Sequence, residues 1–156
     1  MSLKEELKLK KPIALLSHEA LLNIYYTATA IKKDITDFLH QFSLTDVQFN
    51  VLMLLEHHCD DSGGLSQAQI SRMMLVNKAN ITSLIDRMEK GQLVKRTAAD
   101  DRRFNIVKTT AKGKKLLEKV EPLYGKEVTR IMASLNQVEQ KKLITNMEKV
   151  RNGIND

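Results

Sequence analysis

A run of polar side chains between positions 77 and 87 carries the groups in this sequence that are best suited to contacting a polyanion. Amides, hydroxyls and long cations recur there at helical spacing: Asn77, Lys78, Asn80, Thr82, Ser83 and Arg87. Side-chain amides and hydroxyls hydrogen-bond base edges, and cations pair with phosphates. Asn80 suits adenine, Lys78 suits guanine or a phosphate, and Arg87 suits a phosphate. These residues are predicted to form a DNA-contacting face, and an ordinary solvent-facing helix surface is the alternative.

The helix that presents this face is predicted to span residues 78–90, with Asn77 as its N-cap. Apolar residues recur on its other side at i, i+3, i+4 and i+7 and are expected to be buried: Ile81, Leu84, Ile85 and Met88. A shorter helix over residues 66–74 precedes it, because Ser66 and Gln69 have the spacing of a capping box. The buried face expected for this shorter helix consists of Ile70, Met73 and Met74. Two such helices joined by a short turn predict a helix-turn-helix.

After Gly91 the pattern changes from helical to extended. Residues 93–97 and 104–109 are rich enough in β-branched and aromatic side chains to form two strands, and Leu65 can add a third short one. The loop at 98–103 ends in Arg102 and Arg103, and a guanidinium inserted in a narrow minor groove gains from its negative potential. We assign Arg102 to the groove and expect Asp101 to orient Arg103 through a bidentate pair, although the two arginines could exchange these parts. A simple hairpin with surface charges is the alternative.

Four segments follow one another in an order and spacing that resembles the MarR family of bacterial transcriptional regulators. They read ITSLIDRMEK at 81–90, LVKR at 93–96, DRR at 101–103 and VKTTAKG at 107–113. The resemblance extends over the whole chain, because long helices flank these segments on both sides. The chain departs from the family pattern at two positions. Gln92 replaces the Gly that usually precedes the strand, and Leu75 replaces the Gly that is common in the turn between the helices.

The resemblance implies a dimer and control by a small-molecule effector bound between the DNA-binding lobes and the helical dimer region. His18 and Tyr25, in the first long helix, could line such a pocket, with His40 and Tyr26 nearby. They are equally consistent with packing or interface residues.

The composition independently favours a mostly helical single domain. The chain has 156 residues, of which 42% are hydrophobic, 28% charged and only 4% aromatic. The expected fold is mostly α with a small β-hairpin wing. A winged helix-turn-helix DNA-binding lobe at 45–109 would be flanked by a helical dimerisation region at 12–42 and 111–152. The first 11 residues are expected to be frayed.

The flanking helices have recognisable starting signals. Thr45 and Thr110 can each cap a helix, and Asn136 with Glu139 can form another capping box. Pro122 should kink the helix after Thr110. The apolar stripes of the first and the last two helices exceed what one winged domain can bury, which predicts a homodimer. Its two recognition helices would lie about 34 Å apart, so the operator is predicted to be an imperfect palindrome.

The positive charge is confined to the predicted DNA-binding module. Residues 66–115 hold 12 Lys or Arg and 4 Asp or Glu, a net charge of +8, whereas the remainder has 13 and 15 and a net charge of −2. A basic block within a near-neutral scaffold points to a polyanion partner, although charge alone does not exclude a solvated surface.

Residues Glu56–Asp61 gather metal-ligand types at a helix end, but without a fixed Cys/His spacing. A solvated helix end is therefore expected and no metal is predicted. Cys59 is expected to be half-buried, with redox sensing as the alternative. No catalytic constellation or cofactor motif is found, so we expect no enzyme activity. A winged-helix module that binds proteins instead of DNA, and a metal- or redox-sensing regulator, are the alternative functions.

The sequence has no apolar run of the roughly 20 residues that a bilayer-spanning helix needs. It also has no apolar N-terminal stretch typical of a signal peptide, and it has a single cysteine. These features predict a cytoplasmic protein.

Overall fold

The computed structural model describes residues 2–59, 63–74, 78–98 and 105–155, and it divides into two compact units, Met1–Asp46 and Val47–Asp156. The first unit holds α1 (Leu3–Glu6) and α2 (Leu16–His40). A capping box opens α1, because Ser2 N–H donates to Glu5 Oε2 at 2.7 Å and Glu5 N–H donates to Ser2 Oγ at 3.4 Å. The expectation of a wholly frayed N-terminus is therefore wrong for this turn, since a local reciprocal cap stabilises it.

Helix α2 ends in a Schellman motif. Leu44 N–H donates to Leu39 C=O at 3.2 Å and Ser43 N–H to His40 C=O at 3.0 Å, with Ser43 in the left-handed region at φ +56°. Leu39 and Leu44 are buried. Large hydrophobic side chains are nevertheless exposed at the start of α2 and along its length: Leu15, Leu16, Leu21, Tyr25, Tyr26 and Ile31.

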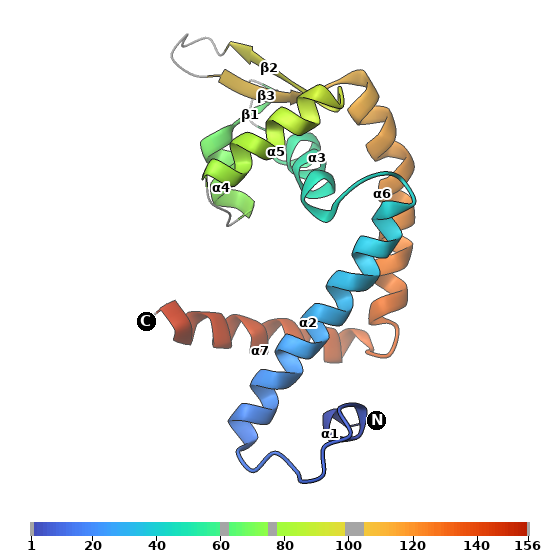
Figure 1. Cartoon of the computed structure of the whole chain (residues 1–156), viewed down its shortest axis with the longest axis vertical. Coiled ribbons are helices and arrows are strands. Elements are labelled where there is room, and N and C mark those ends of the chain that lie inside the picture. The colour runs from blue at the N-terminus through green and yellow to red at the C-terminus, as the bar shows by residue number, and fades with distance from the viewer. Residues whose placement is uncertain (1, 60–62, 75–77, 99–104, 156) are drawn as a thin grey trace. The chain divides into compact units, whose positions relative to one another are not determined.

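The second unit contains the winged helix-turn-helix. Its elements are α3 (Asp46–His57), β1 (Leu65–Ser66), α4 (Gln67–Met74), α5 (Lys78–Lys90), β2 (Val94–Ala98), β3 (Asn105–Thr109), α6 (Ala111–Met132) and α7 (Gln137–Asn155). The three strands form an antiparallel sheet in the order β1-β3-β2, and the sheet lies beside α3, α4 and α5 (Figure 1). The expected fold class, mostly helical with one small wing sheet, is confirmed.

The core of this unit joins the sheet to the helices. Both outer strands meet β3 at the same residue, because Leu65 and Arg96 are each paired with Val107. Side chains from every element except α7 are buried in the unit: Phe49, Val51, Leu52, Leu55, Leu65, Ile70, Ile81, Leu84, Ile85, Met88, Leu93, Val94, Ile106, Val107, Leu117 and Val120. The predicted third strand at Leu65 is confirmed. Strand β2 begins and ends one residue later than predicted, and β3 ends at the predicted Thr109, whereas its predicted first residue, Phe104, lies outside the described residues.

Helix α6 begins at its predicted cap and packs on α3. Thr110 Oγ1 accepts from Gly113 N–H at 3.0 Å. The rings of Phe49 and Tyr124 lie 4.6 Å apart, which holds the middle of α6 to α3. Pro122 lies within α6, which continues through it to Met132.

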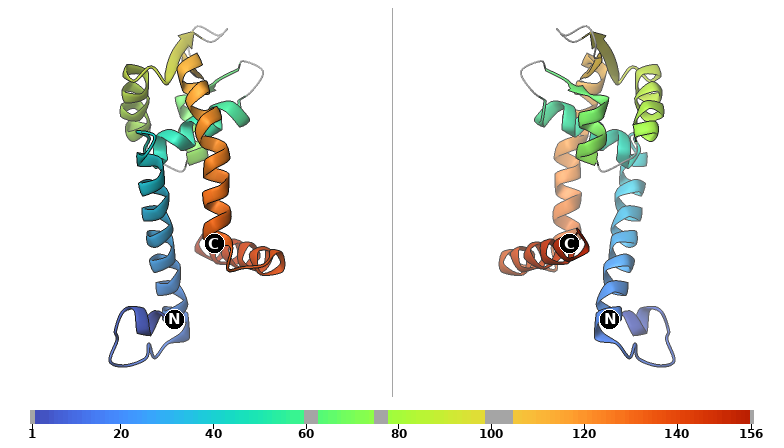
Figure 2. Two further views of the ribbon diagram at one scale, coloured as in Figure 1. Left: turned by 90° about the vertical axis from the view of Figure 1, so that its right-hand side faces the viewer. Right: turned by 90° about the vertical axis from the view of Figure 1, so that its left-hand side faces the viewer.

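Helix α7 opens with the predicted capping box. Asn136 N–H donates to Glu139 Oε2 at 2.8 Å and Glu139 N–H donates to Asn136 Oδ1 at 3.1 Å. Helix α7 leaves the end of α6 in a new direction (Figure 2). It exposes many apolar side chains: Val138, Leu143, Ile144, Val150 and Ile154. In the described part of the chain, no helix has the length and hydropathy of a membrane span.

Candidate nucleic-acid interface

Helix α5 has one apolar side and one polar side, as its periodicity predicted. Ile81, Leu84, Ile85 and Met88 are all at most 4% exposed, so the backing of the helix is fixed in the core. Four of the predicted contact residues project from the opposite side and are exposed: Asn80, Thr82, Ser83 and Arg87. The helix spans the predicted residues 78–90. An exposed polar face on a rigid apolar base is what a recognition helix requires.

Helix α4 is held at its start by the predicted capping box. Ser66 N–H donates to Gln69 Oε1 at 2.7 Å, and Gln69 N–H donates to Ser66 Oγ at 3.2 Å. The predicted buried face needs correction, because Met73 is 43% exposed and Ser71 is buried with Ile70 instead. This short helix turns Ile70 and Ser71 into the core, while Met73 and Met74 line a pocket between α4 and α3.

Thr82 does not stand alone on the polar face, because it contacts a side chain from α4. When the Gln67 amide is oriented to satisfy both neighbours, its Nε2 donates to Thr82 Oγ1 at 3.0 Å. Its Oε1 then accepts from Nε and Nη2 of Arg96, each at 3.0 Å. Gln67 therefore connects a residue of the polar face of α5 to a residue of β2.

Arg96 completes this connection by binding two carboxylates of α5. Its Nη1 donates to Glu89 Oε2 at 2.6 Å, its Nη2 donates to Asp86 Oδ1 at 2.5 Å, and its backbone N–H donates to Glu89 Oε1 at 2.8 Å. The backbone hydrogen bond and then the guanidinium lower the pKa of Glu89. Desolvation lowers the pKa of Arg96, but hydrogen bonds from Asp86 and Glu89 outweigh it and raise that pKa overall.

The C-terminal end of α5 is a second Schellman motif. Leu93 N–H donates to Met88 C=O and Gln92 N–H to Glu89 C=O, both at 2.9 Å. Gln92 occupies the left-handed position at φ +61°. The glycine of this turn, Gly91, lies one residue too early to supply that conformation. The departure noted in the sequence is thus accommodated by a strained glutamine.

The exposed cation Arg87 lies along its own helix. Its Nε donates to Ser83 C=O at 3.2 Å, which leaves the outer nitrogens of the guanidinium directed away from this bond. Arg87 and Ser83 therefore share one stretch of the exposed face. This geometry is compatible with the phosphate contact predicted for Arg87.

Several predicted site residues lie outside the described residues. These are Asn77 and the wing residues Asp101, Arg102 and Arg103, and the side chain of Lys78 is likewise not described. Their assignments stay predictions. The two strands that carry the wing are described, and they are paired over five positions from Val94–Thr109 to Ala98–Asn105.

Two side chains of the segment with metal-ligand residue types contact side chains of α6. His57 Nε2 lies 2.8 Å from Glu121 Oε1, and Glu56 Oε1 lies 3.3 Å from Lys114 Nζ. Within the described residues, which omit positions 60–62, no group of three or more His, Cys, Asp or Glu side chains gathers to hold a metal. Cys59 is exposed, so the expectation of a half-buried cysteine is wrong, since α3 has ended before this position.

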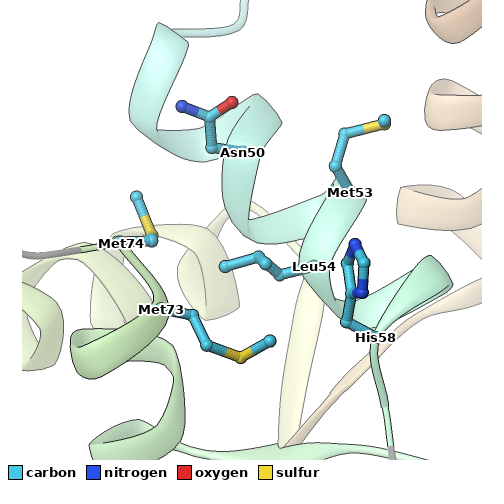
Figure 3. Close-up of a pocket in the computed structure, with 6 residues that line it drawn as sticks. All are labelled: Asn50, Met53, Leu54, His58, Met73 and Met74. Atoms are coloured by element: carbon cyan, nitrogen blue, oxygen red, sulfur yellow. The ribbon is translucent and has the colours of Figure 1, made fainter. Parts of the chain in front are cut away.

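An open pocket of about 310 Å³ lies between α3 and α4. It is lined by Asn50, Met53, Leu54, His58, Met73 and Met74, and Figure 3 shows the thioethers of α4 directed toward α3. The predicted effector residues are not part of its wall. His18 and Tyr25 lie on α2 in the first unit, where both are exposed and Tyr25 is 65% accessible.

This arrangement defines a winged helix-turn-helix protein, and comparisons with known proteins agree. A family model described as the MarR family matches residues 42–103. The chain is 30% identical over 127 residues to the HTH-type transcriptional regulator MhqR of Bacillus subtilis, a match that covers 81% of this chain and 83% of MhqR. It is 29% identical over 131 residues to the HTH-type transcriptional regulator PrsX of Escherichia coli, covering 77% of this chain and 76% of PrsX.

Solved structures share the fold. AbsC, a MarR family transcriptional regulator from Streptomyces coelicolor, superposes with a TM-score of 0.83 at 18% identity, covering 94% of this chain and 99% of AbsC. MepR of S. aureus, solved as a DNA complex, gives a TM-score of 0.75 at 21% identity, covering 84% of this chain and 93% of MepR. The chain belongs to the MarR family of winged helix-turn-helix transcriptional regulators.

Proposed function

We propose that this chain is a homodimeric transcriptional repressor that binds a palindromic operator in double-stranded DNA. The observation that carries the proposal is the exposed polar face of α5, which stands on a fully buried apolar side. A second support is the net charge of +8 over residues 66–115, which attracts phosphates. MepR, which shares the fold, was solved bound to DNA. The proposed action is binding without catalysis.

Within the proposed complex, each residue of the polar face has a part. The start of α5 reads bases in the major groove through Asn77, Lys78, Asn80, Thr82 and Ser83, and Arg87 binds a phosphate. Arg102 enters the adjacent minor groove from the wing, with Asp101 orienting Arg103. The pairing of Thr82 with Gln67 means that Thr82 also contributes to positioning the helix.

The dimer is proposed to form through the helical regions 12–42 and 111–152, outside the DNA-binding lobe at 45–109. Exposed apolar side chains on α2 and α7 support this, because Leu16, Val138 and Ile154 are each at least 75% exposed. Such side chains favour burial against a second copy. A two-fold axis would then present two α5 helices to successive turns of one DNA face, which requires a palindromic site.

Ligand control is proposed as a population shift between lobe spacings that fit DNA and spacings that do not. His18 and Tyr25 on α2 are candidate effector contacts, since both are exposed. The pocket between α3 and α4 is a second candidate, because about 310 Å³ is enough for a small molecule.

Selection of bound sequences from a random pool of duplex DNA tests the proposed function. We expect enrichment of an imperfect palindrome whose half-sites are centred about one helical turn apart. Binding to the enriched duplex should weaken steeply with added salt, because phosphate contacts release counterions. Recovery of no common sequence, together with salt-independent binding, would instead favour a winged-helix module that binds proteins.

A further inference from the structure

Arg96 is a basic residue in a basic lobe, yet its guanidinium is already committed to groups of the protein. It contacts the carboxylates of Asp86 and Glu89 and the amide oxygen of Gln67, and its side chain is only 22% exposed. A guanidinium presents five donors in a fixed planar fork, which is why one side chain can join three partners. The charge of Arg96 therefore compensates two carboxylates of α5 in place of a phosphate.

The partners of Arg96 come from both helices of the helix-turn-helix. Asp86 and Glu89 belong to α5, Gln67 is the first residue of α4, and Arg96 itself lies on β2. Helix α5 lies beside both α4 and β2 (Figure 1). Gln67 also hydrogen-bonds Thr82, one helical turn before Asp86. Helix α5 is therefore held by contacts at Thr82 and again at Asp86 and Glu89.

We propose that Arg96, acting through Gln67, is a positioning residue that sets how well α5 discriminates between DNA sequences, without touching DNA itself. The inference rests on the proposed function, in which α5 reads base edges. Hydrogen bonds to base edges depend on placement within a few tenths of an ångström, whereas attraction to phosphates is long-ranged. Loss of the Arg96 contacts therefore lowers discrimination more than it lowers general affinity for DNA.

The test uses substitutions that leave the net charge unchanged. Arg96→Lys keeps the cation but loses the planar fork, and Gln67→Met removes the bridge to Thr82 at similar volume. Lys95→Arg, the reverse exchange on the neighbouring exposed residue of β2, is the matched control. Affinity is measured for the duplex enriched by the full-length wild type and for an unrelated duplex, over a range of salt concentrations.

We expect Arg96→Lys and Gln67→Met each to lower the ratio of the two affinities about tenfold, the size of one good base contact. Affinity for the unrelated duplex, and the slope of its dependence on salt, should stay at the wild-type values. Lys95→Arg should leave the ratio unchanged. An equal loss for both duplexes, or an unchanged ratio in both variants, would overturn the proposal.

Amide hydrogen exchange separates this inference from the proposed function. In the absence of DNA, exchange from α5 relative to α3 should rise about tenfold in Arg96→Lys and Gln67→Met. If the wild type selects no DNA sequence but this exchange still rises, the proposed function fails and the positioning of α5 by Arg96 stands. If the exchange does not change, the positioning role is wrong whatever DNA binding shows.

Discussion

A methyl group on Gly113 would lie 2.1 Å from the carbonyl oxygen of Leu93, closer than any real Cβ contact. The same carbonyl accepts from Thr110 N–H at 3.1 Å. The first turn of α6 therefore lies directly against Leu93, the residue before β2, and only a residue without a side chain fits there. This contact fixes the wing to α6.

Gly113→Ala should consequently destabilise the protein by about 2 kcal/mol or more, because the clash is with backbone and neither partner can move aside freely. Gly125→Ala is the matched control in the same helix, since nothing lies within 4 Å of its added Cβ. That change should stabilise by about 0.5–1 kcal/mol through helix propensity. Urea unfolding measures both changes, and equal effects would contradict the close contact.

Gln92→Gly should stabilise the protein by about 1 kcal/mol, because it relieves a left-handed residue that carries a side chain. Gly91→Ala is the control, since an added Cβ there meets Arg87 C=O only at 3.4 Å and Met88 C=O at 3.5 Å. The control should change stability by less than about 0.5 kcal/mol. Thermal unfolding distinguishes the two variants. A loss of stability in Gln92→Gly would contradict the strain assigned to the left-handed conformation of Gln92.

Stability should fall in acid partly through Glu89. Hydrogen bonds from the backbone N–H and guanidinium of Arg96 lower the pKa of Glu89 below its ordinary value of 4.5. A carboxyl with a depressed folded pKa contributes stability above its ordinary pKa and loses it as the pH falls through the folded pKa. Urea unfolding at a series of pH values measures this contribution. The free energy of unfolding of the wild type should exceed that of Glu89→Gln most near neutrality, and by progressively less below pH 4.5. If this difference in unfolding free energy grew in acid instead, the lowered pKa assigned to Glu89 would be contradicted.

Arg87→Ala should weaken binding to every duplex and reduce the magnitude of the salt slope by about one, as expected for the loss of a single phosphate contact. Lys142→Ala on exposed α7 removes the same charge far along the chain from the lobe and should leave the slope unchanged. Fluorescence anisotropy over a salt series measures both. Equal slopes in wild type and Arg87→Ala would remove Arg87 from the interface.

Local hydrogen bonding made much of this fold predictable. The capping boxes at Ser66 and Asn136 and the cap at Thr110 depend only on residues three apart, and all three are confirmed. The apolar repeat of α5 likewise fixed which side is buried and which four described polar residues are exposed. Such signals lie within one helical turn and need no knowledge of tertiary structure.

Features that depend on contacts between elements were missed. The exposure of Met73 depends on how α4 packs against α3, and the sequence of α4 alone does not determine it. The hydrogen-bond network of Arg96 joins residues that are as far apart in the sequence as positions 67 and 96, so no local sequence pattern predicts it. The pair Asp86 and Glu89, three apart on the helix that precedes an arginine-bearing strand, is the signal that could have suggested it.

The most direct test of the central claim is the affinity of wild type and Asn80→Ala for the duplex enriched by wild type and for that duplex with one adenine changed per half-site. If α5 reads bases through its exposed face, Asn80→Ala should bind the enriched duplex about tenfold or more weakly, and the base change should then cost little further. If Asn80→Ala binds the enriched duplex as tightly as wild type and still discriminates the altered one, the exposed amide of Asn80 is not a base contact and the assignment of this face to base reading is contradicted.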